Sequence, residues 1–170
     1  KYLVSSIILA ICFCNSKVIA AIRLPAVIGD NMVLQRGCEV SIWGWADAGE
    51  EVTLEFAGQK KEAVADSQCM WKIKLDPMKA SAESRKMLIK GSNEIMLSDI
   101  LVGEVWICSG QSNMSWGIGR TPAEEQQVFK DQKDNRKIRL FHMKNTVHAP
   151  LPAADVSASW KFCNDPASIY

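Results

Sequence analysis

The clearest strand signal in the chain lies at residues 51–58, which read EVTLEFAG. Val52, Leu54 and Phe56 alternate with polar residues, and Gly58 follows as a turn residue. A period of two with the apolar side chains on one side is typical of a strand that buries one face and exposes the other. This stretch therefore predicts a β-sheet of which only one face is covered.

Similar short apolar runs lie on both sides of this stretch and are separated by turn residues. Residues 91–93 (GSN) separate two such runs and predict a hairpin, whereas residues 76–86 predict a loop. Short strands at this regular spacing favour an antiparallel β-sandwich over residues 22–102. The other runs that we interpret as strands are residues 32–35, 40–45, 71–75, 87–89 and 95–97.

The pattern changes after the predicted sandwich. Residues 104–108 (EVWIC) form a compact apolar run that predicts a strand, and residues 121–124 (TPAE) form a capping box that predicts the start of a helix reaching to about residue 133. Alternating residues 137–143 predict a second strand. Strand, helix and strand indicate a parallel crossover, so we interpret residues 103–170 as the start of an α/β domain. These 68 residues are too few to cover both faces of a parallel sheet, and we expect a truncated domain.

The composition excludes several classes of protein. Lys and Arg number 20 and Asp and Glu 19, and the resulting formal charge of +1 gives no electrostatic basis for binding nucleic acid or an anionic membrane. Hydrophobic residues at 48% and charged residues at 23% are near the globular average, which argues against disorder. Six cysteines are too few for a disulfide scaffold of this length.

Residues 1–20 have the pattern of a signal peptide. Lys1 gives a positive start, residues 3–14 are almost all apolar, and residues 18–20 (VIA) resemble a cleavage site. The apolar run is shorter than the roughly 20 residues that a membrane span needs. We therefore expect a secreted, periplasmic or lumenal protein whose mature form has no membrane span. A buried N-terminal element, or a lipoprotein signal at Cys12, is the alternative interpretation.

Four cysteines would remain after cleavage: Cys38, Cys69, Cys108 and Cys163. An even number in an oxidising compartment permits disulfides without requiring them. A Cys38–Cys69 bridge is conceivable, because both residues lie at predicted strand ends; two free, half-buried thiols are the alternative. No metal site is predicted, since the cysteines lack close ligand spacing and the sequence has only two histidines.

Ser112 occupies the position of a nucleophile in the predicted α/β region. The predicted strand at 104–108 leads into a tight turn, and Gly110 permits backbone angles that a side chain would forbid. A hydroxyl there would lie at the carboxyl end of the strand, where backbone N–H groups can face a developing oxyanion. The segment differs from the nucleophile elbow of α/β-hydrolases because Met114 replaces the second glycine. An ordinary turn with a helix-capping serine is the alternative.

Residues 103–114 (GEVWICSGQSNM) resemble the nucleophile block of the sialate O-acetylesterases, which are SGNH-type carbohydrate esterases. Residues 30–35 (DNMVLQ) resemble the N-terminal signature of that family, and residues 138–141 (IRLF) and Trp160 resemble its later segments. The resemblance extends from about residue 22 to the end of the chain. It implies an SGNH hydrolase-like fold for residues 103–170.

The resemblance also implies a chemistry. Ser112 matches the family's nucleophilic serine, which would attack the acetyl ester of a sialic acid or a related sugar and form an acetyl-enzyme. Gln111 and Asn113 would bind the substrate, contribute to the oxyanion site or fix the turn. No cofactor is implied. The histidine and acid that activate the serine are expected beyond Tyr170, so we expect the 170-residue chain alone to be inactive.

The remaining candidates have two interpretations each. His142 and His148 do not match the catalytic histidine and are expected to be structural or exposed. Trp43 and Trp45 share one face of a predicted strand, and they form either a sugar-binding platform or part of the core. Trp116 stacks on a sugar or fills the core. The alternative function is therefore a non-catalytic carbohydrate-binding module formed by residues 22–102.

Overall fold

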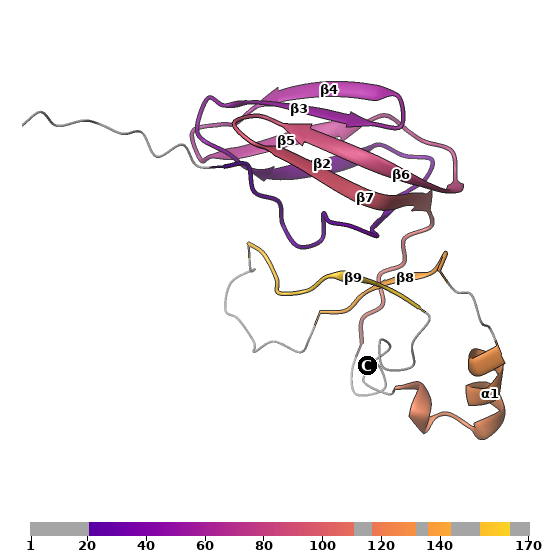
Figure 1. Cartoon of the computed structure of the whole chain (residues 1–170). Helices are drawn as coiled ribbons and strands as arrows, with labels where there is room; N and C mark the ends of the chain where they lie inside the picture. Colours follow the sequence, from indigo (N-terminus) through magenta and orange to yellow (C-terminus); the bar gives the residue numbers. More distant parts are fainter. Residues whose placement is uncertain (1–20, 111–116, 132–135, 144–153, 164–170) are drawn as a thin grey trace, which may run out of the picture.

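A computed structural model describes residues 21–110, 117–131, 136–143 and 154–163, so the predicted signal peptide at residues 1–20 lies outside the described residues. β-Strands make up most of the regular secondary structure of the described chain (Figure 1). The strands of the first region are β1 (Val33–Gln35), β2 (Val40–Trp45), β3 (Glu51–Phe56), β4 (Gln59–Val64), β5 (Met70–Leu75), β6 (Ser81–Lys90) and β7 (Glu94–Gly103). A 3-10 helix (Ile118–Arg120), helix α1 (Ala123–Asp131), β8 (Arg139–Phe141) and β9 (Trp160–Phe162) follow.

Two sheets make up the first region. One has five strands in the order β1-β7-β6-β3-β4, and the other is the β2-β5 pair. The predicted β-rich region is thus confirmed, and its strands pair antiparallel with one exception. β1 pairs parallel with β7, from Val33 opposite Leu101 to Gln35 opposite Gly103. This pairing was not predicted, because a parallel pair joins distant segments and leaves no local turn signal.

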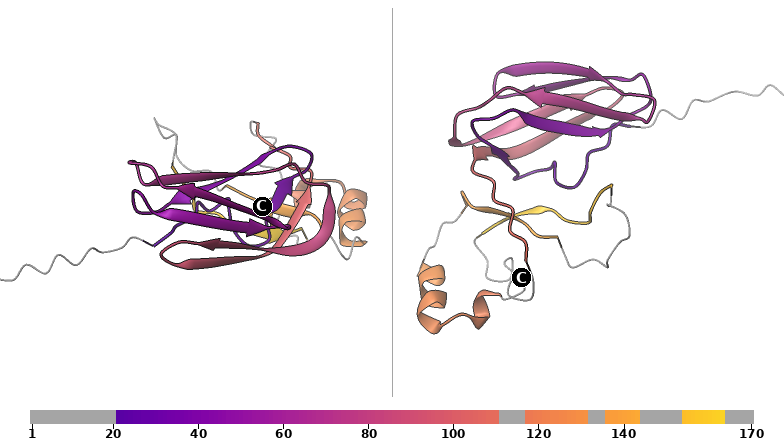
Figure 2. Two further views of the ribbon diagram at one scale, coloured as in Figure 1. Left: turned by 90° about the horizontal axis from the view of Figure 1, so that it is seen from above. Right: turned by 180° about the vertical axis from the view of Figure 1, so that it is seen from behind.

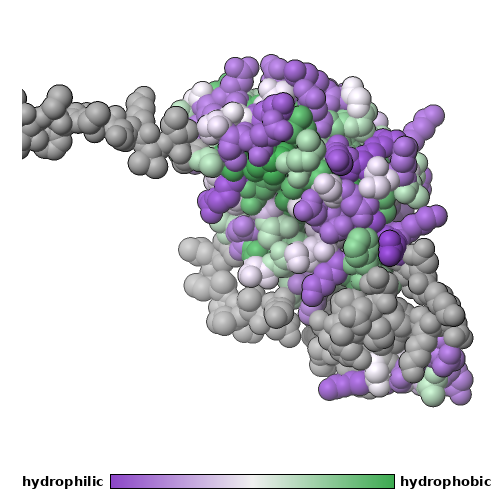
Figure 3. Space-filling view, in the orientation of Figure 1, coloured by the Kyte–Doolittle hydropathy of each residue, from purple (hydrophilic) through white to green (hydrophobic). Residues whose placement is uncertain are grey.

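The core lies between the two sheets and follows the alternation of the sequence. Val52, Leu54 and Phe56 of β3 are at most 2% exposed, and Trp71 and Leu75 of β5, in the other sheet, belong to the same buried cluster. The alternate residues of β3 and β5 are mostly exposed and, apart from Met70, polar. Figure 3 shows the result on one face of the molecule, where hydrophilic side chains surround a smaller apolar area. Burial of one face per strand therefore accounts for the packing of the sheets.

The β6–β7 hairpin corrects one prediction and confirms another. Lys90 pairs with Glu94 across residues 91–93, as the turn sequence indicates. Residues 81–86, however, belong to β6 instead of a loop. The register between β6 and β7 shifts on both sides of the Arg85–Ile100 pair. These β-bulges interrupt the alternation of side chains along β6, and the residues at 81–86 are mostly polar. The sequence of this part of β6 therefore shows no period of two.

The second region differs more from its prediction. Helix α1 is present, but residues 104–108 form no strand, and Trp106 and Ile107 are 83% and 94% exposed. β8 pairs antiparallel with β9, a strand that the sequence did not reveal. The described part of residues 103–170 thus contains no parallel crossover, because the 104–108 run has no partner strand there.

Helix α1 lies at the end of the second region farthest from the sheets, and the β8–β9 ribbon lies between (Figure 1 and the right view of Figure 2). The first turn of α1 carries Glu124 and Glu125, which interact favourably with the positive end of the helix dipole.

Within the described residues, no helix combines the length and the apolar content that crossing a membrane would require.

A Cys38–Cys69 disulfide is excluded by the register of the β2–β5 pair. Val40 lies opposite Leu75 at one end and Trp45 opposite Met70 at the other, so the two cysteines lie at opposite ends of the pair. At about 3.4 Å per residue, the six-residue strands separate these ends by about 17 Å. A disulfide needs Cα atoms within about 7 Å of each other. Both thiols are free and exposed.

We predict that Gly44→Ala lowers the stability of the fold by about 2 kcal/mol. A Cβ at this position would clash with the carbonyl oxygen of Arg23 and lie 3.0 Å from the buried Trp71 ring. The free energy of unfolding in urea measures the effect. Gly29→Ala is the matched control, because its Cβ would meet only the Ala26 oxygen at 3.6 Å. Equal stability of the two variants would contradict the packing described for Trp71.

Candidate functional site

The predicted nucleophile and its neighbours lie outside the described residues: Gln111, Ser112, Asn113, Trp116 and also His148. The structure describes the chain that leads to them. After β7 ends at Gly103, residues 104–110 leave the sheets without regular secondary structure (Figure 1). We call residues 104–110 the approach segment and describe which contacts hold it.

Gln35 and Arg36, at the end of β1, contact the first two residues of the approach segment. The Gln35 carboxamide oxygen accepts a hydrogen bond from the backbone N–H of Val105 (2.8 Å), and its Nε2 donates to Glu104 Oε2 (3.0 Å). Arg36 Nε donates to the other carboxylate oxygen of Glu104 and forms an ion pair with it. Hydrogen bonds from Gln35 and Arg36, together with the Arg36 charge, lower the pKa of Glu104. The direction in which the chain leaves the sheet is fixed by these contacts.

The residues before β1 fix its position against β7. Asp30 Oδ1 accepts a hydrogen bond from the Ser98 N–H (2.6 Å), and the Asn31 N–H donates to the Ser98 carbonyl (3.0 Å). Met32 is 1% exposed, and its carbonyl accepts a hydrogen bond from Leu101 (3.1 Å). Residues 30–35 thus form one unit that joins the core, β7 and the approach segment.

Arg139 on β8 connects the second region to the same part of β7. Its Nη1 forms an ion pair with Asp99 Oδ2 (3.0 Å) and donates to the carbonyl oxygens of Asn31 and Asp99 (both 3.3 Å). Its guanidinium carbon lies 4.5 Å from the ring centroid of Phe162 on β9. The side chain is only 4% exposed. A cation buried to this extent needs such partners, so Arg139 determines how β8 packs against the sheet.

Asp99 occupies a special backbone position. It lies at the bulge of β7 with a φ of 55°, in the left-handed region that Asp adopts more readily than most residues. Burial raises the pKa of this carboxyl. Hydrogen bonds from Arg139 and Ser84 and the charges of Arg139 and Arg136 lower the pKa by more than burial raises it, so the pKa is below its ordinary value. Asp99 is therefore ionised at neutral pH and forms a full ion pair with Arg139.

Two further contacts join the regions. Trp160 Nε1 donates to the Val27 carbonyl (2.8 Å), and Asp155 Oδ1 accepts a hydrogen bond from the Ala26 N–H (2.8 Å). Trp160 also packs against the core, and its ring centroid lies 5.3 Å from that of Phe141. Together with Arg139, these contacts place the β8–β9 ribbon against residues 26–31.

The other candidates have the following positions. His142 is exposed directly after β8. Trp43 packs against the core, and the Arg23 guanidinium lies over the Trp45 ring at 4.5 Å from its centroid, so the two rings do not form an open platform. Cys108 is exposed and Cys163 is buried, which raises the pKa of the Cys163 thiol. In the part of the chain that is described, no three His, Cys, Asp or Glu side chains gather as a metal site would require.

Comparison with known proteins gives the relationship. No family model matches the chain. The sialate O-acetylesterase of Rattus norvegicus is 34% identical over 158 residues, which are 81% of this chain and 28% of that protein. The sialate O-acetylesterase of Homo sapiens is 33% identical over 107 residues, which are 56% of this chain and 20% of that protein. The chain belongs to the sialate O-acetylesterase family. It spans less than a third of the length of these curated relatives.

A solved structure supports the same relationship for this family member. A carbohydrate acetylesterase from Xanthomonas citri superimposes with a TM-score of 0.78 and is 27% identical in sequence. The match covers 88% of this chain and 34% of that chain. The arrangement of strands described above is therefore one that a carbohydrate acetylesterase also adopts.

Sequence reasoning missed the roles of several residues in this sialate O-acetylesterase family member. Gln35 belongs to the signature at residues 30–35, but it contacts residues 104–105, which are about 70 positions later in the sequence. A contact over this separation leaves no local pattern that would predict it. An arginine between the apolar residues Ile138 and Leu140 was the one local hint of a buried cation. Its partner Asp99 is 40 residues away.

We expect Gln35→Ala to loosen the approach segment without unfolding the sheets. The Val105 N–H would lose its acceptor, and an exposed hydrogen bond of about 1 kcal/mol corresponds to about fivefold faster exchange. Amide hydrogen exchange at Val105 is the measurement. Gln59→Ala is a matched control, because Gln59 makes similar exposed contacts with Asp76 elsewhere. Unchanged exchange at Val105 would show that Gln35 does not fix this segment.

Arg139→Met should destabilise the protein by about 2 kcal/mol at neutral pH, since it leaves Asp99 partly buried without its cation. The stabilisation from Asp99 is fully present above the ordinary aspartate pKa and is lost as the pH falls through the lowered pKa of the folded state. The difference in unfolding free energy between wild type and variant should therefore shrink below about pH 4.

Lys90→Met provides the control for that experiment. Lys90 forms an exposed ion pair with Glu94 at 3.1 Å, and its removal should change stability by less than about 0.5 kcal/mol. If both variants behave alike at every pH, the Arg139–Asp99 pair does not connect the two regions in the way described.

Proposed function

We propose that this chain is part of a carbohydrate esterase that hydrolyses O-acetyl esters of sialic acids or related sugars. The observation that carries the proposal is the 34% identity over 158 residues with a protein named sialate O-acetylesterase. The carbohydrate acetylesterase with a similar arrangement of strands supports the reaction class independently. The substrate is an O-acetylated carbohydrate, and the chemistry requires no cofactor.

Ser112 is the proposed nucleophile. Its hydroxyl oxygen attacks the acetyl carbonyl while a base accepts the hydroxyl proton. When the tetrahedral intermediate collapses, the base returns this proton to the departing sugar oxygen, and an acetyl-serine remains. Water, which gives a proton to the same base, then adds to this ester, and acetate leaves as the serine oxygen regains its proton. Backbone N–H groups of the turn, with Gln111 and Asn113 as side-chain candidates, would stabilise the oxyanion. The base and its acidic partner are proposed to lie beyond Tyr170.

The described contacts support a role for the first region in this reaction. A nucleophile works only when it is held close to the productive geometry, and small displacements cost large factors in rate. Gln35 and Arg36 fix the start of the segment that leads to Ser112. In this proposal, residues 22–102 form a β-domain that orients an SGNH-type α/β domain beginning at residue 103.

We also propose that the protein is exported through residues 1–20. The charged start, the apolar stretch and the small-residue end of this segment support the proposal. Secretion into a compartment with acetylated glycans would give the enzyme access to its substrate.

Ser112→Ala tests the function. In a polypeptide extended to the length of the relatives, this change should abolish hydrolysis of a chromogenic acetate and labelling by a fluorophosphonate probe. Ser109→Ala is the matched control, because Ser109 is an exposed serine only three residues earlier in the sequence. Labelling that persists in Ser112→Ala would disprove the assignment of the nucleophile.

The 170-residue chain alone should show no turnover above the rate without enzyme. A serine hydroxyl without a base is a weak nucleophile, and the base is proposed to lie outside the chain. The purified chain, assayed on the same acetate, checks this. Turnover that Ser112→Ala removes would contradict the expectation.

A further inference from the structure

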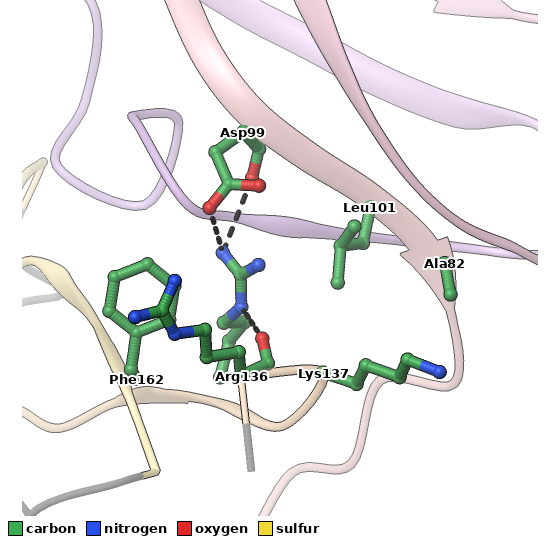
Figure 4. A pocket seen from close by; sticks show the side chains of 7 residues that line it. Ala82, Asp99, Leu101, Arg136, Lys137 and Phe162 are labelled. Carbon is green, nitrogen blue, oxygen red and sulfur yellow. Dashed lines mark hydrogen bonds and ion pairs between the residues drawn. The ribbon is translucent and has the colours of Figure 1, made fainter. Parts of the chain in front are cut away.

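A pocket of about 260 Å³ lies between β7, β6 and the β8–β9 ribbon (Figure 4). Asp99 and Leu101 of β7 form one wall and Ala82 of β6 continues it. Arg139 of β8, with Arg136 and Lys137 just before it, forms the opposite wall together with Phe162 of β9. We call this space the basic pocket.

The lining of the basic pocket has an excess of positive charge. Three cationic side chains, those of Arg136, Lys137 and Arg139, face a single carboxylate, that of Asp99. Asp99 is already engaged, because Arg139 Nη1 forms an ion pair with it at 3.0 Å. Among the described residues, Lys137 takes part in no ion pair. Lys137 therefore adds a positive charge, which no described carboxylate neutralises, to the border of a space open to a ligand.

The donors of the basic pocket differ in rigidity. Within the described part of the chain, the Arg139 guanidinium donates hydrogen bonds from Nε and Nη1, and Nη2 donates none. Since this side chain is 4% exposed and fixed by Asp99, its orientation is set before a ligand binds. Lys137 is exposed and can move toward an anion. One fixed and one mobile donor form a suitable pair for a carboxylate.

We propose that the basic pocket binds the carboxylate of an acidic monosaccharide, with Arg139 and Lys137 as the donors. The wall of Leu101 and Ala82 gives the ligand's carbon skeleton an apolar surface, which a bare inorganic anion would not use. The volume is sufficient for a single small sugar unit. The choice of a sugar as the ligand rests on the proposed function, whereas the preference for an anion follows from the lining residues alone.

The location of the pocket relates it to the approach segment. Leu101 lies two residues before Gly103, where β7 ends and the approach segment begins. Asp99 and Asn31 contact the same arginine that borders the pocket. A ligand in the pocket would thus contact the part of β7 that leads directly to the proposed nucleophile.

The test measures binding to the Ser112→Ala form of the extended polypeptide, so that its result does not depend on turnover. Titration with N-acetylneuraminic acid, followed by NMR, should give a dissociation constant in the millimolar range that weakens as salt increases. Lys137→Glu should raise this constant at least tenfold, and Lys137→Arg should restore it. Lys72→Glu, a charge reversal at an exposed lysine of β5, is the matched control and should have no effect.

Competing ligands distinguish the chemistry. The methyl ester of the same sugar, which lacks the negative charge, should not bind, and inorganic phosphate should bind at least tenfold more weakly than the acid. The proposal is overturned if the acid does not bind, if the ester binds equally, if phosphate binds as well as the acid, or if Lys137→Glu behaves like Lys72→Glu. Loss of esterase activity in Ser112→Ala with no binding of the acid would leave the proposed function intact and remove only the pocket.

Discussion

The burial of β7 is the interaction on which the rest of the structure depends. This strand lies between β1 and β6, and Leu97, Ile100 and Val102 are among the buried residues of the core. At about 25 cal/mol per Å² of apolar surface, burial of such side chains is the main contribution that orders the sheets. The same strand carries the bulge at Asp99 and ends where the approach segment begins. The core, the second region and the path toward Ser112 therefore share one strand.

The Arg139–Asp99 pair gives this arrangement specificity more than stability. Removal of a guanidinium and a carboxylate from water costs several kcal/mol, and their attraction offsets this only when the geometry is good. Here the carbonyl oxygens of Asn31 and Asp99 and the ring of Phe162 supply further partners for the arginine. An apolar side chain in place of Arg139 could pack against the sheet at several positions. The buried Arg139 guanidinium finds hydrogen-bond acceptors and a counter-charge only beside Asn31 and Asp99, so β8 can pack in one position.

The sequence was sufficient to predict elements whose signal is local. Alternation predicted β3 and β5, the turn at residues 91–93 predicted the β6–β7 hairpin, and the capping box predicted α1. β4 was missed because its sequence, QKKEAV, has almost no apolar residues, and the first half of β6 because bulges interrupt its period. Residues 104–108 were wrongly predicted as a strand, since an apolar run gives no information on whether a partner strand lies beside it. The nucleophile at Ser112 stays a prediction from its motif. The contacts of Gln35 and Arg139 join residues far apart in the chain, and no periodicity encodes them.

The lysine-rich character of β4 has a consequence for solubility. β4 is the last strand of its sheet, and a terminal strand presents backbone groups to which the strand of another molecule could add. Lys60, Lys61 and Glu62 lie at the middle of this edge. Parallel, in-register pairing of two copies along β4 would bring Lys60 and Lys61 beside the same lysines of the second copy, which disfavours fibrillar assembly. The polar strand that sequence reasoning overlooked thus protects the sheet against aggregation.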